Sequence, residues 1–127
     1  MKSYTDLKQS KKLAEILPLK SADMRYHTIS HHNPYPCDEI VYTVDFSKPV
    51  DIDIPCWSLA ALLDVFPNSE QKRVDICHGG WKGEEYVSDW FCSYDDYEKN
   101  YFETTNSDNP VDACVEMIIK LKSEQGL

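Results

Sequence analysis

The sequence predicts an α+β fold, with a mainly antiparallel sheet of four to five strands and three helices packed on one face of it. Three segments carry apolar residues at helical spacing and are bounded by capping residues or prolines. The extended segments between them come in pairs joined by turn-rich loops, which favours hairpins. The expected order is α-β-β-α-β-β-(β)-α. A length of 127 residues suits a single globular domain over residues 1–127, in which residues 1–4 are candidates for disorder.

The first helix is expected over residues 5–17. Thr5 is placed to cap it, Asp6 suits its first turn, and Pro18 stops it. Its lysines make this end of the chain the only basic region, and a solvated helix face is the ordinary explanation for them.

Two strands, at residues 23–31 and 39–46, are expected to pair as a hairpin. The second strand has the clearest alternation of apolar and polar residues. The connecting loop at residues 31–36 contains two prolines and an asparagine, which preclude regular pairing.

A second helix is expected at residues 56–66, ended by Pro67. A second hairpin follows, with strands at residues 72–78 and 85–94 around a glycine-rich turn, and residues 100–104 add a short edge strand. The apolar residues that predict this helix by their spacing are Leu59, Leu62, Leu63 and Phe66.

The last helix has the strongest local signals. Asn109 is placed as its N-cap, Pro110 takes the first helical position, Asp112 sits where a capping box needs an acid, and Gly126 is placed to end it. The expected buried stripe consists of Val111, Cys114, Val115, Met117, Ile118 and Leu121.

The composition excludes several classes of function. A net charge of −9 and a pI near 4.7 repel nucleic-acid phosphates and anionic membrane surfaces, so we expect neither direct nucleic-acid binding nor membrane association. No apolar run is long enough for a signal peptide or a membrane span. Five cysteines without a CxxC pair indicate reduced thiols and a cytoplasmic protein.

The most informative feature is an acidic, aromatic band. Residues 81–102 hold eight of the fifteen aromatic residues, and residues 84–116 carry ten acids against one lysine. Such a band favours a non-catalytic protein that binds a basic protein partner, whereas its ordinary explanation is a solvated edge that keeps the chain soluble. The expected contact residues are Asp89, Asp95, Asp96, Tyr97, Glu98 and Tyr101.

The alternative is a small-ligand or zinc-binding protein, or an enzyme with an unrecognised site. Imidazole and thiolate ligands suit zinc, but their spacing here fits no established zinc motif. The sequence contains no nucleophile with an adjacent base and no paired-carboxylate motif that would specify a reaction. An enzyme is therefore the less favoured interpretation, and no cofactor is expected. The weak metal candidates are His27, His31, His32 and Cys37.

Three stretches carry a resemblance to a known group of proteins: residues 54–63, residues 88–94, and the last helix with its Asn109-Pro-Val-Asp-Ala start and Met117-Ile pair. In these the chain resembles small proteins encoded on phages and other mobile elements of gut bacteria. The resemblance covers residues 40–122 and leaves out the basic first helix. It implies the cytoplasm of a bacterium and an accessory role, and it implies no activity and no site residues.

Overall fold

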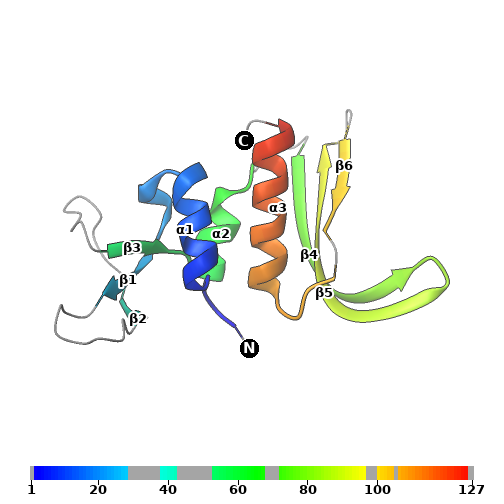
Figure 1. Cartoon of the computed structure of the whole chain (residues 1–127). Helices are drawn as coiled ribbons and strands as arrows, with labels where there is room; N and C mark the ends of the chain where they lie inside the picture. The colour runs from blue at the N-terminus through cyan, green and yellow to red at the C-terminus, as the bar shows by residue number, and fades with distance from the viewer. Residues whose placement is uncertain are drawn as a thin grey trace.

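The computed structural model describes residues 2–28, 38–42, 53–67, 72–96, 100–104 and 106–125 (Figure 1). Its helices and strands follow the order α-β-β-β-α-β-β-β-α, with a short 3-10 turn after the first helix. The elements are α1 (Leu7–Ile16), η1 (Leu19–Ser21), β1 (Met24–Thr28), β2 (Asp38–Tyr42), β3 (Asp53–Cys56), α2 (Leu59–Val65), β4 (Lys72–Lys82), β5 (Glu85–Asp96), β6 (Asn100–Glu103) and α3 (Pro110–Gln125).

The α+β class and the antiparallel pairing are confirmed, but the strands form two sheets. The first has the order β2-β1-β3 and the second β4-β5-β6, and every pair in both is antiparallel. The single sheet expected from the sequence is therefore wrong. Strand β3 was missed because it contains Pro55, which cannot donate to a ladder; an edge position tolerates it, and β3 lies at an edge of its sheet.

Helix α3 is the centre of the molecule. Figure 1 shows it between the second sheet on one side and α1 and α2 on the other. It contacts β5 through one face and α2 and α1 through the other, so the expectation that all three helices cover one face of one sheet is also wrong. Its fully buried residues supply much of the core: Val111, Ala113, Cys114, Met117, Ile118 and Leu121.

The predicted caps of α3 are confirmed. The Asn109 side-chain oxygen accepts a hydrogen bond from the Asp112 N–H at 2.9 Å, and the Asn109 amide donates to the Asp112 carboxylate at 2.9 Å. The first of these bonds satisfies a backbone N–H that the first turn would otherwise leave open, and the second holds the two side chains together. Pro110 is the first helical residue. Gly126 lies outside the described residues.

Helix α1 is shorter than the predicted range of residues 5–17, and it is capped one residue later than the sequence suggested. Its N-cap is Asp6, whose carboxylate accepts from the Gln9 N–H at 2.7 Å, while the Gln9 side chain accepts from the Asp6 N–H at 3.0 Å. Thr5 is fully buried instead: its hydroxyl lies 2.8 Å from the Ser10 hydroxyl and accepts from the Trp57 N–H at 3.1 Å. Thr5 is thus a link between α1 and β3.

Helix α2 is shorter than predicted. Its N-cap is Ser58, whose hydroxyl accepts from the Ala61 N–H at 3.2 Å, and Asp23 holds Ser58 through both its backbone N–H and its hydroxyl. Cys56, expected inside this helix, ends β3. The predicted stripe is only partly buried, because Leu62 is fully buried and Leu63 is 44% exposed.

The first sheet and the residues that follow β3 contact the amino-terminal segment. Strand β1 pairs with β2, as the hairpin prediction required, and Tyr26 on β1 donates its hydroxyl to the Thr5 carbonyl at 2.7 Å. Tyr4 forms an isolated bridge with Ser58, so residues 2–5 run alongside the connection from β3 to α2. The parts of the predicted strands at residues 29–31 and 43–46 lie outside the described residues.

Candidate functional site

The second sheet has an inner and an outer face, which alternate along each strand. Val74, Ile76, Cys92, Tyr94 and Phe102 belong to the inner face and pack into the core against α3. The residues between them point away from α3, because successive side chains of a strand lie on opposite faces. We call these residues the outer face: Arg73, Asp75, Cys77, Asp89, Phe91, Ser93, Asp95, Tyr101 and Glu103.

The outer face is strongly acidic. It carries four carboxylates, from Asp75, Asp89, Asp95 and Glu103, and Arg73 is the sole cation among its described side chains. Arg73 pairs with Asp75 at 3.0 Å between Nε and Oδ2, and their side chains are 63% and 45% exposed, so solvent screens this ion pair and it is weak. The other carboxylates therefore leave the face with a net negative charge.

Neighbouring side chains on the outer face respond to this charge. The Tyr101 hydroxyl donates to the Glu103 carboxylate at 2.9 Å, and this hydrogen bond is the main cause that raises the pKa of Tyr101. Burial raises the pKa of the Cys77 thiol, and the charges of Asp75 and Glu103 raise it further. Both groups stay protonated near neutral pH, so neither supplies a nucleophile.

The structure places the predicted contact residues in three groups. Asp89, Asp95 and Tyr101 belong to the outer face. Asp96 has the opposite orientation along β5 and lies opposite Lys72 and Asn100 at the end of the sheet. Tyr97 and Glu98 lie outside the described residues.

The register of the strands decides which acids gather. Asp89 and Asp95 are six residues apart on one strand, about 20 Å at 3.3 Å per residue. Asp75 and Glu103 fill the gap, because both lie opposite Ser93 on the neighbouring strands. Sequence reasoning missed Asp75. Alternation alone puts it on one face of its strand, but only the pairing register brings it beside Glu103.

Beyond the outer face, the hairpin of β4 and β5 continues as an arm. We define the hairpin arm as residues 78–90. Figure 1 shows it curving away from α3, and its two-residue turn contains Gly83 with a φ of 64°, which glycine adopts readily. Trp81 and Tyr86 meet edge to face across the arm at 5.6 Å, and they are 73% and 59% exposed. At the base, His78 stacks on Trp90 at 4.2 Å.

The amino-terminal lysines do not neutralise the outer face in the described structure. Lys2 instead contacts Asp112 at 2.8 Å and Asp6 at 3.0 Å. Burial acts to raise the pKa of Asp112, but hydrogen bonds from Lys2, Gln9 and Asn109 outweigh it and lower that pKa. Asp112 belongs to the acidic, aromatic band of the sequence, but its carboxylate holds Lys2 and Gln9 and is not part of the outer face.

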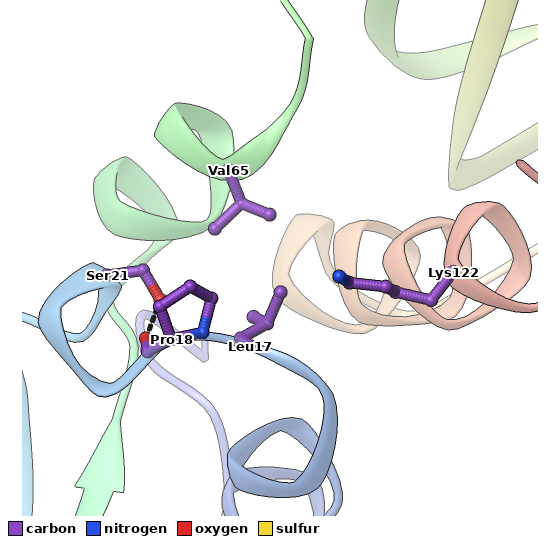
Figure 2. A pocket seen from close by; sticks show the side chains of 5 residues that line it. All are labelled: Leu17, Pro18, Ser21, Val65 and Lys122. Atoms are coloured by element: carbon purple, nitrogen blue, oxygen red, sulfur yellow. Dashed lines mark hydrogen bonds between the residues drawn. The ribbon is translucent and has the colours of Figure 1, made fainter. Parts of the chain in front are cut away.

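A small pocket lies where α1, α2 and α3 end (Figure 2). Its volume of about 240 Å³ is below the range of about 300–1,000 Å³ of ordinary ligand sites. The carboxyl ends of three helices meet there, and each carries a partial negative charge. The positive charge of Lys122 balances these partial charges, so the pocket has no excess positive charge that would attract an anion. The pocket thus has the features of incomplete packing between helices. Its lining residues are Leu17, Pro18, Ser21, Val65 and Lys122.

The described residues supply no metal centre. No group of three or more His, Cys, Asp or Glu side chains within them could hold a metal ion. His27 lies on β1, but its side chain is not among those described, and the other predicted metal candidates, His31, His32 and Cys37, lie outside the described residues. The zinc prediction therefore remains a prediction.

The buried cysteines belong to the core. Cys92 on β5 and Cys114 on α3 are fully buried, and the hydrogen bond between their thiols, followed by burial, strongly raises the pKa of Cys92. Burial likewise raises the pKa of Cys56. A thiol with a raised pKa is a poor nucleophile at neutral pH.

No protein-family model, no curated protein and no solved structure matches the chain. Among the described residues, no helix combines the length and the apolar character needed to cross a membrane.

Proposed function

We propose that this protein is a non-catalytic accessory protein of a bacterial mobile element, and that its outer face binds a basic protein partner. One observation carries the proposal: a sheet whose inner face is covered by α3 presents on its outer face four carboxylates and a single cation among the described side chains. The mobile-element context rests on the resemblance of residues 40–122.

Electrostatics favours a basic partner. Like charges disfavour nucleic acids and anionic membranes, whereas complementary charge increases the rate at which a basic protein associates. Asp89 is exposed and Asp95 is half-buried, and neither forms a hydrogen bond or ion pair within the described part of the chain. Both carboxylates are therefore available to a partner without first breaking an internal contact.

Aromatic side chains give the same face a means of specific contact. Tyr101 is 60% exposed, and its hydroxyl is already held by Glu103, so its ring is oriented before a partner arrives. Tyrosine is enriched among the residues that dominate interface energies, because it offers a large contact area for little lost conformational entropy.

The test compares two variants with the same change in net charge. The first, Asp89→Lys with Asp95→Lys, reverses charge on the outer face. The control, Asp64→Lys with Glu124→Lys, reverses two exposed acids on α2 and α3 that form no hydrogen bond or ion pair within the described residues. Affinity capture from a bacterial lysate should recover basic proteins with the wild type and the control, and should lose them with the outer-face variant.

Salt provides a second readout. Capture by charge should weaken as ionic strength rises, because the Debye length falls to about 8 Å at 0.15 M. Equal recovery of the same partners by both variants would overturn the proposal, and so would recovery of nucleic acid free of protein.

A further inference from the structure

The hairpin arm is built to hold two aromatic rings away from the core. In Figure 1 it extends past α3, and residues 80–82 of β4 pair with residues 85–87 of β5 along it. Trp81 and Tyr86 face each other near its end as a cross-strand pair. The ladder is irregular between His78 and Gly80, where Gly79 has a φ of 76°, so the arm bends as it leaves the body.

Several contacts stiffen the arm. The rings of His78 and Trp90 stack with only 2° between their planes at its base. The Trp90 backbone also exchanges two hydrogen bonds with Ser107, at 2.9 and 2.7 Å, which ties the base to the segment before α3. An isolated two-stranded ribbon is marginally stable, so these contacts and the Trp81–Tyr86 pair help to keep the arm formed.

Hairpin stability accounts for the aromatic pair but not for its exposure. Trp81 is 73% exposed and Tyr86 is 59% exposed, so most of each side chain faces solvent. A cross-strand pair could stabilise the ribbon equally well if both rings were covered. Exposed tryptophan and tyrosine on a rigid support are the residue types that most often dominate binding interfaces.

The charge around the two rings identifies the kind of group that fits there. Glu84 lies in the turn beside the two rings, and Asp89 lies near the base of the arm on their face of the ribbon. Both carboxylates are exposed, and neither forms a hydrogen bond or ion pair within the described part of the chain. Glu85 is exposed too, but it lies opposite Lys82 in the register and so belongs to the other face. An aromatic ring attracts a cation over its face, and nearby carboxylates add to this attraction. A planar guanidinium stacks on a ring and is more weakly hydrated than an ammonium.

We infer that the tip of the hairpin arm receives an arginine side chain of the partner, with its guanidinium stacked on Trp81 and its charge balanced by the adjacent carboxylates. This rests on the proposed function, and it deepens it by naming the anchor and the residue type that it captures. A second copy of the chain is a poorer occupant, because its own arm would bring the same negative charges together.

The test uses three short peptides with the full-length protein. They share neutral flanking residues and differ only at the central position, which is arginine, lysine or citrulline. Titrations followed by NMR should shift the Trp81 indole N–H signal, and the arginine peptide should bind more tightly than both others. Citrulline keeps the shape of arginine and removes its charge.

Substitutions at the tip separate ring stacking from general attraction to acids. Trp81→Leu keeps an apolar side chain but removes the ring, and it should weaken binding of the arginine peptide by about two- to fivefold, the range for an exposed cation–π contact. Trp81→Phe should restore part of the loss. The Asp64→Lys and Glu124→Lys control should bind all three peptides as the wild type does. Unchanged α3 amide signals would show that each variant remains folded.

Several results would overturn the inference. These are equal binding of the citrulline peptide, unchanged arginine binding in Trp81→Leu, or a Trp81 signal that shifts with protein concentration alone and so reports self-association. Loss of lysate partners in the outer-face variant but not in Trp81→Leu would sink the inference and leave the proposed function standing. Arginine-selective binding at Trp81 would support the inference. If neither charge reversal changed the lysate partners, the proposed function of the outer face would nevertheless be wrong.

Discussion

Lys2 and Asp112 are 110 residues apart in the sequence, yet their side chains meet at 2.8 Å between Nζ and Oδ1. The same ammonium lies 3.0 Å from the Asp6 carboxylate and 2.7 Å from the Gln9 side-chain oxygen. Both acids lie at helix amino ends, where the helix dipole favours negative charge. Lys2 therefore joins the start of α1 to the start of α3.

Removing this ammonium should destabilise the protein modestly. We expect Lys2→Met to lower the free energy of unfolding by about 1 kcal/mol, because the Lys2 and Asp112 side chains are 25% and 35% exposed and solvent screens their attraction. Urea denaturation measures the change. Lys12→Met is the matched control, since Lys12 contacts Glu15 at 3.8 Å between two exposed side chains and should cost little. Equal effects of the two substitutions would contradict a structural role for Lys2.

The same cluster should make stability depend on pH in the acid range. The pKa values of Asp6 and Asp112 are lowered on folding, although burial acts to raise them, because hydrogen bonds from Gln9 and Lys2 favour the charged form. Their contribution is fully present above the unfolded pKa of about 3.9 and is lost as pH falls through the folded values. The difference in stability between the wild type and Lys2→Met should be constant from about pH 5 to pH 8, because this range lies about one unit or more above the unfolded pKa. It should shrink below about pH 4, where the carboxylates begin to be protonated. A stability difference that stays constant down to about pH 2, about two units below the unfolded pKa, would contradict the contribution of these two carboxylates.

The buried thiols should resist modification while the protein is folded. Cys56, Cys92 and Cys114 are fully buried, and their environment raises the pKa values of Cys56 and Cys92. We expect iodoacetamide at pH 8 to label these sites only at the rate at which the protein unfolds, because burial blocks access to all three thiols and the raised pKa values of Cys56 and Cys92 also disfavour the thiolate at those two. Site-resolved mass spectrometry with and without urea measures this. Cys77, which is half-buried on the outer face, should react faster than all three.

The caps of α3 could be predicted because their signals are local. Asn109, Pro110 and Asp112 lie at the start of one helix within a single turn, so their signals depend on residues no more than three positions apart. The start of α1 was displaced by one residue for the opposite reason. Thr5 and Asp6 are both good caps, and the choice between them depends on Trp57, which follows β3 and donates its backbone N–H to the Thr5 hydroxyl.

The division into two sheets could not be predicted from hairpin patterns. A hairpin specifies which neighbouring strands pair, but whether two hairpins join edge to edge depends on what lies between them. Here α3 inserts its buried stripe between the second sheet and the other two helices. The same limit applies to the outer face, because Asp75 and Glu103 gather with Asp95 only through the pairing register.

Substitutions at Leu62 and Leu63, two neighbouring residues of the same type, test how α2 packs on the core. The sequence pattern puts both on the apolar stripe, but Leu62 is fully buried against α3 and its neighbours, whereas Leu63 is 44% exposed. Leu62→Ala should lower the free energy of unfolding by about 2–5 kcal/mol, because it removes buried methyl groups and leaves a cavity. Leu63→Ala should cost less than about 1 kcal/mol, since surface substitutions have small effects. Urea denaturation of both variants measures the difference, and similar losses of stability would mean that α2 is rotated from the orientation described.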